Sequence, residues 1–395
     1  MNLYIYNNLP ENPVVASLLK WRESGDTSLY YNACAGLLQA RMGLREYAAA
    51  VLMDDVPPID RPESMAYFHH DIDEIYENIL SFDWNGLCKK SGVLPLPDFS
   101  HDSSPNASDY DKTAAKLKTA ESAAEFGGVM IDFFSNYSCA DEAKYDAFMW
   151  ENGSLRGVAE TDAISFGDMA ALGSKKDALI ENTAAFVSGR PAQDTLLAGA
   201  SGTGKSSCVK AVFNMYRPAG LKLAELLKED ISALPKLMEE IGKRKRQYII
   251  FIDDLSFDGS DANYKALKVA LDGRIGRRPA NTLLYATSNR VHLVRETWKD
   301  REESEDIHEN ETMHEKMSLS ERFGLRLYFQ ALTQPEYFEI VALLLAKQGV
   351  EFDEETGKKA AAWEMRGNGR SGRTAKQFVD WNLGAGTWSL DKSRT

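Results

Sequence analysis

The chain has 395 residues, of which 44% are hydrophobic and 27% are charged. This composition is ordinary for a globular protein and excludes fibrous, collagen-like and wholly disordered chains, and the length predicts two or three domains. The net charge of −13 disfavours long-range attraction to nucleic-acid backbones and to anionic membranes.

The cysteines and the apolar runs indicate the compartment. Cys34, Cys88, Cys139 and Cys208 are scattered and form no Cys-x-x-Cys pair, so we expect neither a disulfide framework nor a zinc site. The N-terminus lacks a basic stretch followed by an apolar run, so no secretory signal is expected. The longest apolar stretch, near 341–346, is too short to cross a bilayer. We therefore expect a cytoplasmic protein with no membrane partner.

The N-terminal region, 1–154, is predicted to be mainly α-helical. Apolar residues recur at helical spacing in 12–21, 29–42, 44–53 and 114–134. Asn12 and Pro13 suit the N-cap and the first helical position, and the polar stretch 95–112 predicts a loop. The run 69–74 contains two histidines and several acids, and we interpret it as a helix surface, not a metal site. No catalytic motif falls in this region.

The character of the chain changes at about residue 155, where strand-like apolar runs begin to alternate with helical patterns. Strands are expected at 195–197, 221–226, 248–252, 282–287 and 325–329. Helices are expected at 205–216, from an N-cap at Ser232 to Gly242, and at 264–271. This alternation predicts an α/β fold, a parallel sheet with helices on both faces.

After residue 329 the pattern is helical again. Pro335 opens one predicted helix, and further helices are expected near 354–365 and 374–381. We therefore divide the chain into a mainly helical N-terminal domain (1–154), an α/β domain (155–332) and a C-terminal helical domain (333–395).

The strongest motif is Gly199-Ala-Ser-Gly-Thr-Gly-Lys205-Ser206, which fits G-x-x-x-x-G-K-[ST] at every position. Its glycines let the backbone wrap around a polyphosphate, and the N–H groups and the following helix N-terminus favour the anion. Lys205 would bring a charge to the outer phosphates and Ser206 a hydroxyl to Mg2+. A chance glycine-rich loop is disfavoured because an apolar run precedes the motif and an amphipathic helix follows it. The predicted binding residues are Gly199, Ala200, Ser201, Gly202, Thr203, Gly204, Lys205, Ser206 and Ser207.

A second motif, Tyr248-Ile-Ile-Phe-Ile-Asp253-Asp254, predicts a buried strand that delivers two carboxylates to its C-terminal edge. We expect Asp253 to hold Mg2+ through water and Asp254 to polarise the attacking water as a general base. A strand followed by a solvated acidic turn is the alternative, and the complete phosphate loop upstream disfavours it. Together the two motifs predict ATP and Mg2+ as the cofactors.

With these motifs the sequence resembles the AAA+ superfamily of P-loop ATPases. The run Leu283-Leu-Tyr-Ala-Thr-Ser-Asn289 resembles the sensor strand, which implies that Asn289 helps to orient the attacking water. The run Leu319-Ser-Glu-Arg322-Phe-Gly324 resembles the segment that carries the arginine finger. This resemblance implies that Arg322 reaches the nucleotide of a neighbouring subunit, where a guanidinium neutralises charge on the transferred phosphoryl group.

Two further segments complete the resemblance, which covers the chain from about residue 155. The run Gly372-Arg373-Thr-Ala-Lys-Gln-Phe378 resembles the start of the sensor-2 helix in a C-terminal lid, which implies a nucleotide contact for Arg373. The run Phe166-Gly-Asp-Met-Ala-Ala-Leu172-Gly173 resembles the segment that packs on adenine, which points to Leu172 and Gly173. Each sensor residue has a plain structural alternative, as a turn cap, a surface arginine or a helix cap. Their order along the chain favours the functional interpretation.

Within the superfamily the motifs resemble an uncharacterised bacterial family of predicted ATPases, which implies a chemistry but no client. Most AAA+ proteins carry Asp-Glu where this chain has Asp253-Asp254. The shorter side chain sets the second carboxylate back by about 1.5 Å, which favours slow turnover and switch-like use of ATP. Asp-Asp also occurs in replication initiators and helicase loaders of the superfamily.

The sequence therefore predicts an ATP-hydrolysing AAA+ protein that works as a homo-oligomer and remodels or switches an unknown protein client. One alternative is a replication initiator or helicase loader, supported by Asp253-Asp254 and by Arg274, Arg277 and Arg278. Contact with nucleic acid thus stays open without being favoured. A second alternative is an ATP-binding switch with negligible turnover. A small-molecule kinase is less favoured because no acceptor site is recognised in the sequence. The acidic run 298–315 is interpreted as an exposed insertion.

Overall fold

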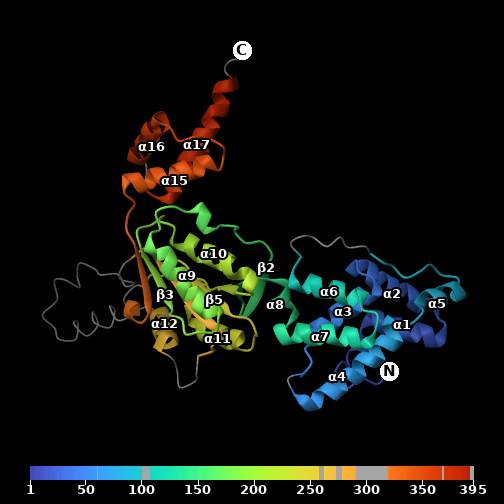
Figure 1. Ribbon diagram of the computed structural model, residues 1–395. Coiled ribbons are helices and arrows are strands. Elements are labelled where there is room, and N and C mark those ends of the chain that lie inside the picture. The colour runs from blue at the N-terminus through green and yellow to red at the C-terminus, as the bar shows by residue number, and fades with distance from the viewer. Residues whose placement is uncertain are drawn as a thin grey trace. The chain divides into compact units, whose positions relative to one another are not determined.

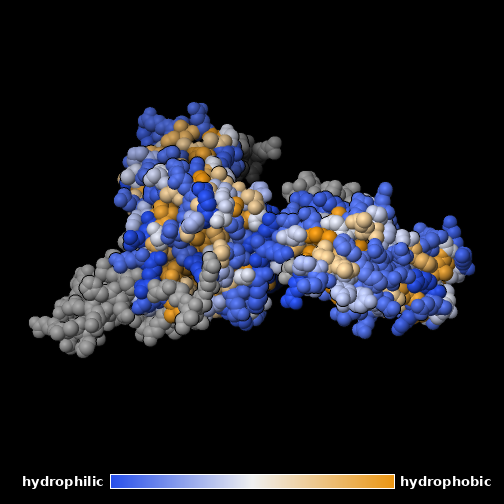
Figure 2. Space-filling model, turned by 60° about the horizontal axis from the view of Figure 1, so that its bottom comes forward, coloured by the Kyte–Doolittle hydropathy of each residue, from blue (hydrophilic) through white to orange (hydrophobic). Residues whose placement is uncertain are grey.

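The computed structural model (Figure 1) describes residues 1–59, 61–99, 107–257, 262–272, 278–290, 319–366 and 369–391. They belong to two compact units. The helical unit comprises Met1–Tyr145 with Lys243–Lys245, and the α/β unit comprises Asp146–Gly242 with Arg246–Thr395. Among the described helices, none has both the length and the apolar character that a bilayer crossing requires. On the face shown in Figure 2, hydrophilic residues predominate.

The helical unit is built from amphipathic helices around one core. Its elements are η1 (Leu9–Glu11), α1 (Pro13–Ser24), α2 (Thr27–Ala40), α3 (Leu44–Asp54), α4 (Pro62–Ile75), η2 (Tyr76–Leu80), α5 (Trp84–Ser91), α6 (Asp109–Thr119), α7 (Ala123–Asn136) and α8 (Ala140–Lys144). The expected N-cap is confirmed, because the Asn12 side chain accepts the N–H groups of Val14 and Val15. The core includes the fully buried rings of Trp21 and Phe133.

Two predicted boundaries in this unit are wrong, and helix capping explains both. The loop expected over 95–112 ends early, because Ser108 and Asp111 form a capping box that starts α6 at Asp109. The single helix expected over 114–134 is two helices. Ser122 accepts the N–H of Glu125 at 3.1 Å and starts α7 as its N-cap.

Helix α4 carries the run 69–74. Asp73 is exposed, as expected for a helix surface, but Asp71 is completely buried. Its carboxylate accepts the backbone N–H groups of Tyr4, Ile5 and Tyr6 at 2.9, 2.7 and 3.0 Å. The prediction failed for Asp71 because its partners lie more than sixty residues away in the sequence. The described part of the chain holds no cluster of three or more histidine, cysteine, aspartate or glutamate side chains placed to bind one metal ion.

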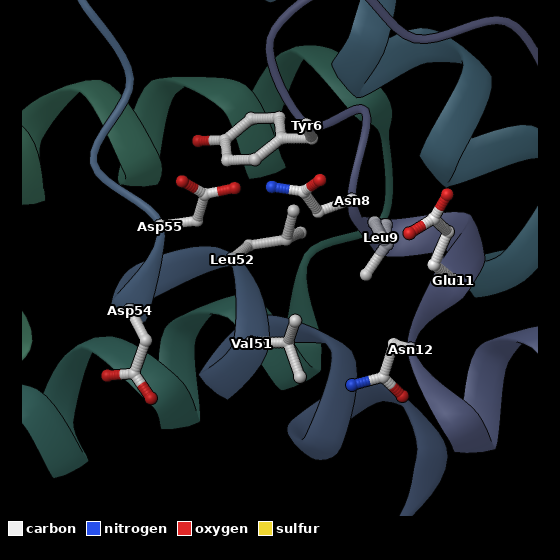
Figure 3. A pocket seen from close by; sticks show the side chains of 9 residues that line it. All are labelled: Tyr6, Asn8, Leu9, Glu11, Asn12, Val51, Leu52, Asp54 and Asp55. Carbon is white, nitrogen blue, oxygen red and sulfur yellow. The ribbon is translucent and has the colours of Figure 1, made fainter.

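An open pocket of about 450 Å³ lies on the helical unit (Figure 3). Figure 3 shows the ring of Tyr6 above Asn8 and Asp55, with Leu52 beneath them. Burial raises the pKa of Asp55. Asp54, also at this pocket, forms an ion pair with Lys144 at 3.5 Å. One acid of this pocket, Asp54, therefore has a cationic partner within the same unit.

Within the described residues, seven strands of the α/β unit form one sheet in the order β2-β1-β4-β5-β6-β3-β7. The strands are β1 (Ala147–Glu151), β2 (Ser154–Val158), β3 (Thr195–Gly199), β4 (Lys222–Glu225), β5 (Tyr248–Ile252), β6 (Thr282–Ser288) and β7 (Leu325–Phe329). Neighbours are parallel except β1 and β2, which pair antiparallel. The five strands expected from the sequence are present, and β1 and β2 were not anticipated.

Helices cover both faces of this sheet (Figure 1). Helices α9 (Ser174–Val187) and α10 (Lys205–Tyr216) share a core with β5 and β6 on one face. On the other side lie α11 (Leu234–Gly242) and α12 (Ala262–Asp272). The expected α/β fold class, a largely parallel sheet with helices on both faces and a mainly helical N-terminal region, is confirmed.

One predicted helix cap is wrong, and some predicted features fall on residues that the structure does not describe. Ser232 is not an N-cap, because it lies inside the 3-10 turn η5 (Lys228–Ala233), whose backbone is already helical before α11. The remaining 3-10 turns are η3 (Phe166–Asp168) and η4 (Arg217–Ala219). Arg274, Arg277 and the acidic run 298–315 lie outside the described residues.

The C-terminal helices have a small core of their own. They are α15 (Gln334–Ala346), α16 (Glu354–Arg366) and α17 (Gly372–Asp391). Thr333 and Glu336 form a capping box at the start of α15, and Tyr337 and Phe378 are fully buried in the shared core. We call these three helices the lid helices.

Candidate nucleotide-binding site

The predicted phosphate loop connects β3 to α10. Gly199 has a φ of +135°, and a Cβ added there would lie 1.9 Å from the carbonyl oxygen of Phe329 on β7. Only glycine fits this approach between two strands. The loop is closed by the Thr203 hydroxyl, which donates to the Ala200 carbonyl at 2.8 Å. Ser201 is exposed on the loop, and Ser207 lies in the first turn of α10.

Lys205 lies within this loop with only 5% of its surface exposed. Its Nζ donates to the carbonyls of Gly199 and Ala200 at 2.9 and 2.7 Å and to Oδ1 of Asn289 at 2.9 Å. Burial lowers the pKa of Lys205, while the carboxylates of Asp253 and Asp254 raise it in opposition. The ammonium group is therefore directed from α10 towards the loop and towards Asn289, which follows β6.

The two predicted acids follow β5 and lie beside the loop. Oδ1 of Asp253 accepts the hydroxyl of Ser206 at 2.6 Å and also the hydroxyl of Thr287. Asp254 has a φ of +52°, a left-handed conformation that acidic residues tolerate better than most. Oδ1 of Asp254 accepts Nδ2 of Asn289 at 2.7 Å. Asn289 thus links the loop lysine to the second acid.

The donor set fits Mg2+. Ser206 and Asp253 offer a hydroxyl and a carboxylate oxygen at one place, and hard oxygen donors are what Mg2+ prefers. These two residues would hold the ion beside the phosphate loop. In the bound state the ion would supply positive charge at the phosphates.

Thr287 is a site residue that the sequence interpretation missed. It is 2% exposed, its hydroxyl donates to Asp253, and its Oγ1 accepts the backbone N–H of Asp254 at 2.9 Å. One side chain therefore holds both acids in place. A sequence signal existed, because Thr287 lies in β6 two positions before Asn289, which directly follows the strand, so the alternation of the strand predicts the same face for both.

Glu225 was also missed. It is the last residue of β4, the strand next to β5. Burial raises the pKa of Glu225, with a further upward contribution from Asp253 and a downward one from Lys210. In the sequence it is one acid among 59 acidic residues, so nothing local distinguished it.

The segment expected to pack on adenine lies against the phosphate loop. A Cβ on Gly204 would lie 2.9 Å from Cε of Met169. Leu172 is 5% exposed and packs in the core beside α9 and α10. Gly173 has a φ of +56° and immediately precedes α9. The segment is thus close to the loop, while the Leu172 side chain belongs to the core.

The lid helices touch the phosphate loop at the start of α17. The N–H of Gly372 donates to the carbonyl of Gly202 at 2.7 Å. A Cβ on Gly202 would lie 3.9 Å from Cβ of Arg373. Arg370 instead pairs with Glu364 of α16 at 3.0 Å. The structure therefore places Arg373 beside the loop.

Arg322 is not brought together with the other predicted residues. It precedes β7 and so lies at the N-terminal end of that strand. The phosphate loop follows the neighbouring parallel strand β3 and lies at the C-terminal ends of the strands. The two ends of a five-residue strand are roughly 16 Å apart. Arg322 lines a pocket of about 590 Å³ there, together with Arg190 and Asp194.

A family model matches most of the α/β unit. This family is described as "Protein of unknown function (DUF815)", and the match covers residues 143–386, more than half of the chain. No curated protein matches the chain.

Several solved structures resemble the chain at low identity. Thermotoga maritima RuvB, as the R170A variant, is 17% identical with a TM-score of 0.38, covering 56% of this chain and 65% of that chain. The FIGL-1 AAA domain in complex with ADP is 19% identical with a TM-score of 0.38, covering 56% and 73%. A T. maritima RuvB structure described as a Holliday junction branch migration motor is 15% identical with a TM-score of 0.32, covering 54% and 69%. The chain thus spans slightly less than two thirds of the first RuvB.

Proposed function

The chain belongs to the family described as "Protein of unknown function (DUF815)", and on that premise we propose that it binds ATP with Mg2+ and hydrolyses it. One observation carries this proposal. Lys205, Ser206, Asp253, Asp254 and Asn289 converge at one edge of the sheet and are joined by hydrogen bonds. A lysine, a hydroxyl and two carboxylates at the end of a phosphate loop are the groups that phosphoryl transfer to water requires.

Each group has a distinct role in this proposal. The loop N–H groups and Lys205 hold the phosphates, and Ser206 and Asp253 hold the ion. Asn289 and Asp254 orient the attacking water, and Asp254 accepts its proton. Arg373 contacts the phosphates from the lid helices, since α17 begins beside Gly202.

We further propose that the protein acts as a homo-oligomer. Arg322 precedes β7 and lies at the end of the strands opposite to the phosphate loop, which supports a role at the nucleotide of a neighbouring subunit. The helical N-terminal region would engage a protein client, because its described residues bring no comparable set of groups together. The four free cysteines support a cytoplasmic location.

The replication-initiator alternative gains no support from the described residues. Arg278, one of the three arginines that suggested it, is bound by Asp194, with its Nη2 2.8 Å from Oδ1. This pair also fixes the backbone, because Asp194 accepts the N–H of Leu284 at 2.8 Å. A side chain held this way serves the fold and offers little to a nucleic-acid phosphate.

The test is steady-state ATP hydrolysis against protein concentration for the wild type, Arg322→Ala and the control Arg156→Ala. Arg156 is an exposed arginine on β2, the outer strand on the side of the sheet away from β7. We expect specific activity to rise with concentration and to fall at least about a hundredfold in Arg322→Ala alone, with ATP binding retained. Activity independent of concentration and of Arg322 would overturn the shared site. Stoichiometric ATP retention without turnover would establish the switch instead.

A further inference from the structure

Glu225 lies on the same face of the sheet as the magnesium-binding acid. In the parallel pair of β4 and β5 it aligns with Phe251, and Asp253 comes two positions after Phe251. Side chains two positions apart on a strand point to the same face. Leu223, which precedes Glu225 by two positions, shares with Phe251 the core cluster that contains the apolar side of α10.

Charge effects agree with this placement. Asp253 accepts the hydroxyl of Ser206 in the first turn of α10, and Lys210 is one turn further along the same helix. Both Lys210 and Asp253 act electrostatically on Glu225. Glu225 therefore lies between the first turns of α10 and the end of β5, beside the predicted magnesium ligands.

The Glu225 carboxylate lacks a counter-charge of its own. Lys210 is already paired with Asp162. Among the described residues, the Glu225 carboxylate forms no hydrogen bond or ion pair, although the residue is half-buried. A half-buried carboxylate without a protein partner keeps its acceptor oxygens available for a cation or for water bound to one.

We propose that Glu225 is a third acidic residue of the magnesium site, which holds the hydrated ion from the side of β4. This inference rests on the proposed nucleotide function. Mg2+ keeps several of its waters in protein sites, and carboxylates just beyond the direct ligands accept hydrogen bonds from them. Ser206 and Asp253 offer the direct oxygens, and Glu225 adds negative charge and acceptors next to them. Glu225 is thus a positioning residue and not a catalytic one.

The proposal predicts effects of opposite sign with and without the ion. In Glu225→Gln the ion loses a charged acceptor, so a higher Mg2+ concentration is needed. Without Mg2+, the same change removes a negative charge near the phosphates, so nucleotide binds equally well or more tightly. A purely structural role would weaken binding in both conditions.

The experiment is equilibrium binding of a fluorescent ATP analogue to the full chain, in EDTA and across a Mg2+ titration. We expect the Mg2+ concentration at half-saturation to rise about tenfold in Glu225→Gln, with no loss of binding in EDTA. The matched control is Glu181→Gln, an exposed glutamate on α9, which should leave both values unchanged. Glu225→Asp, which keeps the charge, should give a smaller rise than Glu225→Gln.

The outcomes separate this inference from the proposed function. A wild type that binds no nucleotide would overturn both. A wild type with Mg2+-dependent binding that Glu225→Gln leaves unchanged would overturn only the role of Glu225. Equal weakening in EDTA and in Mg2+ would also overturn it, and would assign Glu225 to the fold.

Discussion

Acidic side chains are held differently in the helical unit and in the α/β unit. Asp71 in the helical unit is completely buried, and three backbone N–H groups of its own chain satisfy its carboxylate. Asp253 and Asp254 in the α/β unit are exposed and share hydroxyl and amide donors at the end of a strand. A carboxylate satisfied by the chain contributes to stability. One with spare lone pairs beside a phosphate loop is suited to bind a ligand.

The largest expected effect is on the buried acid of the helical unit. Asp71→Ala would leave three N–H groups without their charged acceptor, so we expect a loss of about 4 kcal/mol in the free energy of unfolding. Denaturant unfolding measures it, and Asp73→Ala, an exposed acid on the same helix, is the matched control. ATP-analogue binding by folded Asp71→Ala should equal that of the wild type. A loss below 1 kcal/mol would show that the carboxylate is not what holds the N-terminal segment.

The next effect falls on function and not on stability. Lys205→Ala removes the charged donor of the loop, and we expect nucleotide binding to weaken about a hundredfold, as for the loss of strong charge-assisted hydrogen bonds. The free energy of unfolding should be unchanged or slightly higher, because burial disfavours the charged ammonium that is removed. Lys236→Ala on α11 is the control. Destabilisation without loss of binding would reverse the comparison between the two units.

These residues also show how much the sequence could predict. The phosphate loop and the two acids after β5 were found because each motif is contiguous and its chemistry dictates its spacing. Asp71 and Glu225 could not be found that way, since their roles depend on partners brought in by the fold: Asp71 by the N-terminal segment and Glu225 by the register of β4 with β5. Arg322 was named by resemblance, and its predicted role still awaits the concentration test.

Most predicted helices and strands are present, and the errors have local causes. The missed strands β1 and β2 are short, and β1 joins the sheet by pairing with β4 more than seventy residues later. The long helix expected near 114–134 was split by Ser122, whose capping role depends on the backbone conformation and not on apolar periodicity. Periodicity therefore locates helices better than it locates their ends.

A smaller effect is expected at Thr287, which positions the functional acids without touching the phosphates. Thr287→Val keeps the shape but removes the donor to Asp253 and the acceptor of the Asp254 N–H. We expect the rate of ATP hydrolysis to fall about tenfold, the effect of roughly 1.4 kcal/mol in the transition state, with analogue binding in EDTA unchanged. Thr287→Ser restores the hydroxyl and should recover most of the rate. If the serine variant is as slow as the valine variant, packing and not hydrogen bonding explains the residue.

The smallest expected effect is at Asp168, a half-exposed acid in η3 that pairs with Lys347 at the end of α15. Hydrogen bonds from Lys347 and Ser165 lower the pKa of Asp168 to about 2. Because the folded pKa is depressed, the stabilisation is present above about pH 4 and is lost as the pH falls towards 2. The pair is partly exposed, so we expect only about 0.5 kcal/mol at pH 7. A double-mutant cycle of Asp168→Asn and Lys347→Met in denaturant unfolding measures it. Coupling that persists at pH 2 would show that charge is not its source.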